Sequence, residues 1–299
     1  MFKEFNTLTL EELNRINDEN LFDYIKVFCQ AEVVEFNDND ECLSVVNNIN
    51  GISMITNCVN RANFSASDVD GCIDRVLNKF RSRGLPLMWT VGPITKPENL
   101  GKYLLKKGMM HVDTYTKMAI ALDSLNREHR LSDDFEIFEV TEKSLLDKWF
   151  NIYSVSFDLS WLIEAAHKKF YAGLFLDSGI PAKTYIGLWK GHPVATSQVF
   201  FNNECAGIYN IDTLPEARNR GLGYMMTLKA LLKAKEEGYK TATLQATKKG
   251  YPIYKKLGFI DTGHSDCYIK MHGVSMVAIP VSFIARIAIN KFRSIFKTP

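Results

Sequence analysis

Two arginines and two glycines stand close together in the stretch ARNRGLGYMM, residues 217–226. Gly221 and Gly223 have no Cβ, so a ligand can approach their backbone closely. The apolar residues that follow recur at helical spacing, and the first N–H groups of such a helix point outward without intrahelical acceptors. With the helix dipole, this arrangement favours a phosphate, and Arg218 and Arg220 add charged donors. From these residues alone, a solvated turn with permissive glycines is the alternative.

The elements around this turn alternate between strands and helices. The strand GIYNIDT precedes it, and a helix to about Gly238 follows it. Next come the strand TATLQAT, the helix GYPIYKKLG and the strand CYIKMHG. Upstream, the sequence predicts a strand at FEIFEV, helices over 141–157 and 160–175, and a hairpin about Lys190-Gly191. This order indicates a layered α/β domain, and the turn lacks the Walker lysine and the third Rossmann glycine.

Two motifs in this region resemble one family. Arg218 to Gly223 fits the Q/R-x-x-G-x-G/A signature of the GNAT superfamily of acyl-CoA N-acyltransferases, at the strand-to-helix junction where that family carries it. About 30 residues later, Tyr254 to Phe259 is similar to the family's Tyr-x-x-Leu-Gly-Phe. The resemblance covers residues 136–272. It implies a mixed sheet splayed between GIYNIDT and TATLQAT, with the pantetheine arm of acetyl-CoA in the gap.

The resemblance also implies which residues bind the cofactor. The backbone of the strand GIYNIDT would bond the pantetheine, the glycine turn would hold the diphosphate, and the facing strand would add Thr247, with Gln245 beside it. An ordinary strand position is the alternative for both of these residues. The implied cofactor-binding residues are Ile211, Asp212, Thr213, Arg218, Asn219, Arg220, Gly221, Leu222, Gly223, Tyr224, Thr247 and Tyr254.

Acyl transfer to an amine needs a neutral nucleophile, a stabilised oxyanion and a proton for the departing thiolate. Tyr254 matches the family's proton-donating tyrosine, and a phenol with a pKa near 10 is protonated at neutral pH; a core tyrosine is the alternative. The matching strand stretch Cys205–Ile208 offers no carboxylate for the base, so Asp212 is a weaker second catalytic candidate and Glu204 is another nearby acid. A water chain, or an amine that arrives neutral, stays open. The backbone of Ile211 or Thr213 is the expected oxyanion donor.

Composition excludes several other classes of function. The 36 Lys and Arg residues against 34 Asp and Glu leave a net charge of +2, which does not favour nucleic acid as a partner. Six histidines and six cysteines show no metal-ligand spacing, so no metal is expected. Thiols without pairing, and a charged N-terminus unlike a secretory signal, favour a reducing cytoplasm.

The 299 residues suggest two domains. Residues 1–125 are expected to form a degenerate GNAT-like or unrelated accessory α/β domain, 126–135 a linker, 136–273 the acetyltransferase domain and 274–299 an amphipathic tail helix. The first half begins with a helix capped by Thr9, and VNRANFSASDVDG stands where a cofactor turn would fall. The tail is expected to dock on the domains or on a second subunit; contact with a membrane surface is possible but not favoured.

The expected fold is therefore α/β, with two GNAT-like domains that each have a mixed, mostly antiparallel sheet flanked by helices, and a C-terminal amphipathic helix. The expected activity is direct transfer of an acetyl group from acetyl-CoA to a primary amine of a small-molecule or peptide acceptor, in a ternary complex. The alternatives are a non-catalytic acyl-CoA sensor and an interaction protein. The motifs do not define the oligomeric state.

Overall fold

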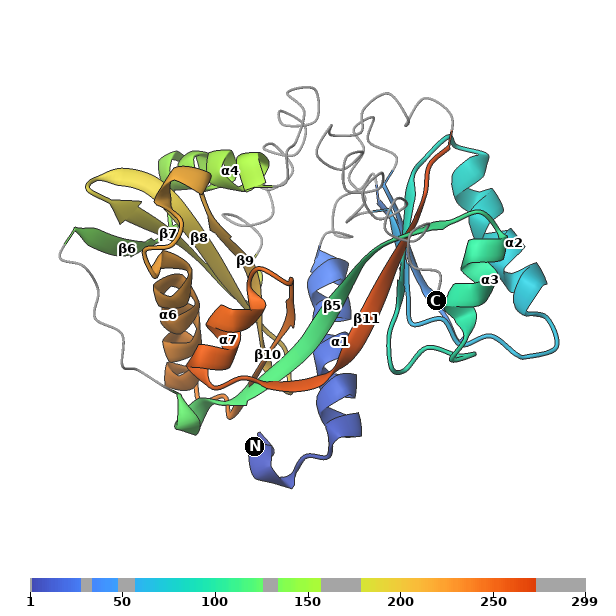
Figure 1. Ribbon diagram of the computed structural model, residues 1–299, viewed down its shortest axis with the longest axis horizontal. Helices are drawn as coiled ribbons and strands as arrows, with labels where there is room; N and C mark the ends of the chain where they lie inside the picture. Colours follow the sequence, from blue (N-terminus) through green and yellow to red (C-terminus); the bar gives the residue numbers. More distant parts are fainter. Residues whose placement is uncertain (1, 28–33, 48–56, 126–133, 157–178, 273–299) are drawn as a thin grey trace, which may run out of the picture. The chain divides into compact units, whose positions relative to one another are not determined.

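The computed structural model describes residues 2–27, 34–47, 57–125, 134–156 and 179–272 (Figure 1). Within these ranges the chain is mixed α/β, with one series of eleven strands in the order β1-β2-β3-β4-β11-β5-β10-β9-β8-β7-β6. The strands are β1 (Val34–Asp38), β2 (Leu43–Asn47), β3 (Cys58–Asn60), β4 (Leu87–Val91), β5 (Met110–Ala121), β6 (Phe135–Glu139), β7 (Ala182–Trp189), β8 (His192–Phe201), β9 (Ala206–Thr213), β10 (Thr241–Ala246) and β11 (Ile260–Lys270). The α-helices are α1 (Leu10–Val27), α2 (Val69–Arg81), α3 (Leu100–Lys106), α4 (Lys143–Ser156), α6 (Leu222–Glu236) and α7 (Tyr251–Leu257).

The chain divides into two compact units. Unit 1 is built from Met1–Val27, Thr116–Leu159 and Glu164–Gly263. Unit 2 is built from Phe28–Tyr115, Ser160–Ile163 and His264–Pro299.

The two units repeat one pattern of strand pairing. In unit 1, β7, β8 and β9 are antiparallel, β9 pairs with β10 in parallel, and β10 pairs with β5 antiparallel. In unit 2, β1, β2 and β3 are antiparallel, β3 pairs with β4 in parallel, and β4 pairs with β11 antiparallel. The strand that ends each half of the sequence therefore pairs in the other unit. This agrees with two GNAT-like halves but joins their strands into one series, where the sequence suggested a sheet in each domain.

This exchange of strands explains why the units differ from the boundaries expected from the sequence. The expected linker at 126–135 keeps each half together, whereas the units divide within β5, after Tyr115, and within β11, after Gly263. The first residues up to Val27 also belong to unit 1. The polar stretch at 126–135 is the expected boundary because its hydrophobic periodicity is low. A division that falls inside the continuous strands β5 and β11 has no such signal in the sequence.

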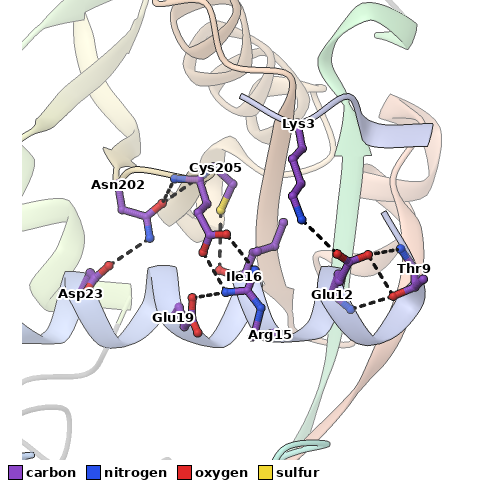
Figure 2. Close-up of polar contacts among 10 residues, drawn as sticks. Lys3, Thr9, Glu12, Arg15, Ile16, Glu19, Asp23, Asn202 and Cys205 are labelled. Carbon is purple, nitrogen blue, oxygen red and sulfur yellow. Dashed lines mark hydrogen bonds and ion pairs between the residues drawn. The ribbon is translucent and has the colours of Figure 1, made fainter. Parts of the chain in front are cut away.

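Helix α1 begins with a capping box. The Glu12 carboxylate accepts from the Thr9 backbone N–H at 2.9 Å, and the Thr9 hydroxyl accepts from the Glu12 N–H at 3.2 Å (Figure 2). Each side chain satisfies an N–H group that the helix start would otherwise leave unpaired. The structure thus confirms the cap predicted at Thr9.

Polar contacts fasten α1 to the turn between β8 and β9. The Arg15 guanidinium forms two hydrogen bonds with the Glu204 carboxylate, at 2.9 and 2.7 Å. Asn202 Nδ2 donates to Asp23 at 3.0 Å (Figure 2). Contacts at both places along the helix fix its register on unit 1.

A hydrophobic cluster on one face of the unit 1 sheet joins the strands to α6 and α7. On β5, Met118 and Ile120 belong to this cluster, whereas Ala119 packs in a second cluster with Leu13 and Ile16 of α1. This alternation is the period of two that a strand imposes, and it separates the α6 and α7 face from the α1 face.

Two local predictions are confirmed, and others fall outside the described residues. Lys190 and Gly191 form the β7–β8 turn with φ of 50° and 76°, as a two-residue hairpin turn requires. The final strand is longer than predicted, because β11 begins at Ile260. The helix expected over 160–175, the tail helix and most of the linker lie outside the described residues. In the part of the chain that is described, no helix is long and apolar enough to span a membrane.

Candidate active site

Strands β9 and β10 share only a short parallel ladder. The paired positions are Ala242 with Ala206 and Thr243 with Gly207, at the start of both strands. Beyond Gly207, β9 continues for six residues along β8 without a further partner position on β10 (Figure 1). The backbone edge of β9 that follows the ladder is therefore not used in pairing with β10, which is the splay that the sequence predicted.

The glycine turn leads directly into α6, and two of its residues have left-handed backbone. Asn219 has φ of 62°, and Gly221 has φ of 78° and caps the helix start. A side chain at Gly221 would be strained in this conformation. A Cβ at Gly223 would lie 3.3 Å from Ile253 and 3.7 Å from the Thr213 hydroxyl, so this glycine lets the helix start pack closely between β9 and α7. The turn therefore has the compact backbone, the helix N-terminus and the charge that a diphosphate needs.

The two arginines of the turn take different positions. Arg218 Nε donates to the Thr213 carbonyl at 3.0 Å, which holds the guanidinium beside the end of β9. The Arg220 guanidinium lies over the Trp189 ring, with its carbon 4.1 Å from the ring centroid. Stacking on an indole restrains an exposed arginine and keeps its N–H donors available at the edge. Both charges thus stay near the turn.

Tyr254 lies on α7, close to β9. Its ring packs on Phe259 with centroids 5.9 Å apart, and a Cβ at Gly250 would lie 3.1 Å from its hydroxyl and 2.8 Å from its ring. Gly250 thus leaves the space that the phenol occupies, a role that the sequence alone did not indicate. Burial, followed by the negative charge of Asp212, raises the pKa of Tyr254 above its usual range. The phenol therefore keeps its proton at neutral pH and can act as a donor.

Asp212 is the carboxylate whose charge acts on the Tyr254 phenol. Burial raises the pKa of its carboxyl to about 6, against the opposing effects of the Ser156 hydroxyl and the Arg218 charge. Asp212 Oδ2 and Ser156 Oγ are both buried, and the geometry between them falls short of a hydrogen bond. The hydroxyl of Ser156 therefore offsets little of the cost of burial. A carboxylate with a pKa near neutrality is suited to accept a proton.

A bulge in β9 precedes Asp212, and it was not predicted from the sequence. Thr196 pairs with Asp212 and Gln198 pairs with Tyr209, so Asn210 and Ile211 together oppose one residue of β8. Asn210 adopts φ of 51°, a left-handed value that asparagine tolerates better than most residues. Asparagine and the alternation of apolar residues around it were the available signal, but the bulge itself depends on the pairing with β8.

Several other residues singled out in the sequence have structural partners. The Thr247 hydroxyl accepts from the Gly250 N–H at 3.1 Å, so it caps the turn before α7. Gln245 Nε2 donates to Asn17 of α1 at 2.6 Å. Tyr224 and Leu222 are buried in the α6 cluster, and Glu204 is held by Arg15 as described above. On the helix predicted over 141–157, Trp149 is fully buried.

In unit 2, β3, the segment that follows it and α2 correspond to β9, the glycine turn and α6 of unit 1, but their residues are arranged differently. After β3, the chain reaches α2 at Asp68, and a Cβ at Gly71 would lie 2.2 Å from the Asp68 carboxylate. Arg75 pairs with the same carboxylate at 3.1 Å. A negative side chain therefore lies at the helix start, where it opposes an anionic ligand. The cradle of unit 1 has no equivalent at this position of unit 2.

The comparisons with known proteins agree with the repeated strand pairing and with the glycine turn of unit 1. Residues 146–259 match the family model described as "Acetyltransferase (GNAT) family". This segment of the chain is therefore similar to the GNAT acetyltransferases. The comparison with curated proteins found no match.

Solved structures of tandem length share the whole fold. A GCN5-related N-acetyltransferase from Kribbella flavida is 16% identical with a TM-score of 0.67, and the match covers 86% of this chain and 96% of that chain. A tandem GNAT protein from the clavulanic acid biosynthesis pathway is 9% identical with a TM-score of 0.57, covering 85% of this chain and 95% of that chain. A functionally unknown conserved protein from Staphylococcus epidermidis is 13% identical with a TM-score of 0.59, covering 82% and 97%. At these identities the likeness shows the fold.

Proposed function

We propose that this protein is an acetyl-CoA-dependent N-acetyltransferase that acts on a primary amine of a small molecule or peptide. The observation that supports this most is the convergence of three features in unit 1. The ladder between β9 and β10 ends early, the glycine turn starts α6 beside the end of β9, and the charge of Asp212 acts on the buried Tyr254 phenol. Similarity to the family adds the expectation of acyl transfer.

The glycine turn and strand β9 would bind different parts of acetyl-CoA. The N–H groups at the start of α6, with Arg218 and Arg220, suit the diphosphate. The backbone of Ile211 and Thr213 on β9 suits the pantetheine and the carbonyl of the acyl group. Bound acetyl-CoA supplies an activated thioester, whose carbonyl carbon is the electrophile. An oxyanion needs hydrogen-bond donors, so the N–H groups of the strand, and not its carbonyls, are the candidates for stabilising it.

Two proton transfers complete the proposed mechanism. Asp212 accepts a proton from the incoming ammonium, which frees the nitrogen lone pair for attack. The new C–N bond forms as the C–S bond breaks, and the Tyr254 hydroxyl gives its proton to the departing sulfur. The nitrogen loses its second proton as it becomes an amide, and this proton restores the Tyr254 hydroxyl through solvent, while Asp212 releases its proton to solvent. Each side chain ends the cycle in the protonation state in which it began.

The test measures acetyl-CoA consumption over a panel of primary amines, for the wild type and for Tyr254→Phe. We expect turnover by the wild type and a loss of about 10²-fold or more in kcat for the variant, with little change in acetyl-CoA affinity. Tyr251→Phe is the matched control, because its hydroxyl bonds Asp261 on the protein surface at 2.8 Å. Equal rates for Tyr254→Phe and the wild type would remove the tyrosine from the mechanism. Tight binding of acetyl-CoA without turnover on any amine would instead support a sensor.

A further inference from the structure

Helix α1, from the N-terminal end of the chain, presents a polar face to the catalytic unit. Four polar residues of this helix are nearly inaccessible to solvent: Asn14, Asn17, Asp18 and Asn20. Asn17 Nδ2 donates to the Leu244 carbonyl on β10 at 3.1 Å, and Asn20 Nδ2 donates to the Cys205 carbonyl before β9 at 3.0 Å. Buried amides of this kind cost free energy unless they are paired, so their pairing gives the helix one position on the two strands.

The same helix reaches the β9 bulge through Tyr24. The Tyr24 hydroxyl donates to Gln198 Oε1 at 2.6 Å and accepts from Asn210 Nδ2 at 2.9 Å. Asn210 Nδ2 also lies 3.0 Å from Gln198 Oε1, and the Asn210 carbonyl accepts from the Thr196 hydroxyl at 2.8 Å. The Tyr24 ring stacks on Tyr209, with centroids 4.2 Å apart and planes 4° from parallel. Both residues before Ile211 are thereby held by α1.

The bulge decides the side of the sheet on which Asp212 lies. Ala206 and Ile208 pack in the α6 cluster with the regular spacing of two, but the next member on β9 is Ile211, three residues later. The extra residue reverses the alternation, so Asp212 lies beside Ser156 of α4 and not in the α6 cluster. Without the bulge, a shift by one residue would exchange the sides of Ile211 and Asp212.

We propose that Tyr24 is a positioning residue for acyl transfer, which acts through Asn210 to hold the β9 bulge and so orients Asp212 and the strand's N–H groups toward the acyl group. This inference rests on the proposed function and deepens it, because it gives the N-terminal helix a part in the reaction of the second half. Tyr24 itself does not contact the proposed substrate positions. Its effect is on geometry, and small displacements of reacting groups are costly.

The experiment compares Tyr24→Phe with Tyr209→Phe. Both variants keep the stacked rings and lose one buried hydroxyl, but the Tyr209 hydroxyl bonds Asn20 at 2.8 Å and takes no part in the bulge contacts. We expect Tyr24→Phe to lower kcat about tenfold or more with the KM for acetyl-CoA within about threefold, since the diphosphate turn is untouched. Tyr209→Phe should retain kcat within about threefold, and urea unfolding should show similar losses of stability for both variants. Equal kcat values for the two variants would overturn the inference.

Amide hydrogen exchange gives a second readout that does not depend on turnover. In Tyr24→Phe, we expect the amides of Ile211, Asp212 and Thr213 to exchange about fivefold faster or more, whereas Tyr209→Phe leaves them unchanged. If the wild type turns over no amine, the proposed function fails, and the exchange comparison still decides whether Tyr24 holds the bulge. Unchanged exchange in Tyr24→Phe would overturn the inference even if the wild type is active.

Discussion

Asp212→Asn tests whether the carboxylate in the candidate site is desolvated in the folded protein. Burial raises the pKa of Asp212 from the ordinary 3.8 to about 6, so the folded protein holds this proton more tightly than the unfolded chain. Below about pH 4 the carboxyl is protonated in both states and burial costs little. As the pH rises toward 6, the unfolded chain ionises first, and above 6 the folded protein carries the full cost of a buried charge.

The size of this cost follows from the shift. A rise in pKa from 3.8 to about 6 corresponds to about 3 kcal/mol at full desolvation. The side chain is only partly buried, so solvent screening reduces the expected effect to about 1–2 kcal/mol. The neutral amide of Asp212→Asn carries no charge at any of these pH values. We therefore expect the variant to be more stable than the wild type at pH 8 by this amount, with the advantage shrinking at pH 4.

Urea unfolding at pH 4 and pH 8 measures the effect, with Glu216→Gln as the matched control. Glu216 is an exposed carboxylate in the short 3-10 helix Pro215–Ala217 just before the glycine turn, so its variant should change stability equally little at both pH values. In the same samples, wild-type kcat/KM should fall as the pH drops through about 6, and Asp212→Asn should lose about 10²-fold or more. An advantage of Asp212→Asn that is the same at both pH values would refute a desolvated carboxylate. Wild-type activity in Asp212→Asn would refute its role as the base.

Three further predictions concern the turn and helix α1. Gly221→Ala, at φ of 78°, should lower the free energy of unfolding by about 1 kcal/mol and weaken acetyl-CoA binding in calorimetry. Gly84→Ala is the control, because Gly84 has φ of 66° and no neighbouring atoms around its Cβ position; it should lose similar stability and leave binding unchanged. Thr9→Ala should lower the free energy of unfolding by about 1 kcal/mol, because it breaks the capping box; no change in a urea titration would contradict that role. Lys117→Met should lower the free energy of unfolding by about 3–5 kcal/mol, because the buried Asp18 carboxylate, 2.6 Å away, loses its cation. The double variant Lys117→Met with Asp18→Leu should recover much of this loss.

The glycine turn and its neighbours were predictable because their geometry is local. The left-handed backbone at Gly221, the helix that follows and the hairpin turn at Lys190-Gly191 each depend on a few adjacent residues. The same holds for the cap at Thr9 and the placement of Tyr254 on a short helix after β10. These features allowed the family to be recognised and the cofactor site to be expected in the second half of the chain.

Other parts of the site could not be predicted, because they depend on residues far apart in sequence. Nothing near Tyr24 indicates that its hydroxyl meets Asn210, 186 residues later. The bulge that turns Asp212 toward α4 exists only because β8 and β9 pair in a shifted register. Polar residues on α1 resemble an exposed helix face until β9 and β10 supply their partners.

The sequence by itself predicted the resemblance to the family, the candidate diphosphate turn and the candidate proton-donating phenol, since each is encoded in a short run of residues with its own backbone preference. Only the tertiary structure decided that β5 and β11 each pair in the unit of the other half, and that α1 packs in unit 1. Strand exchange leaves no local mark, because a strand has the same alternation whichever partner it pairs with. The pairing is chosen by the burial of whole faces and by hydrogen bonds between distant segments.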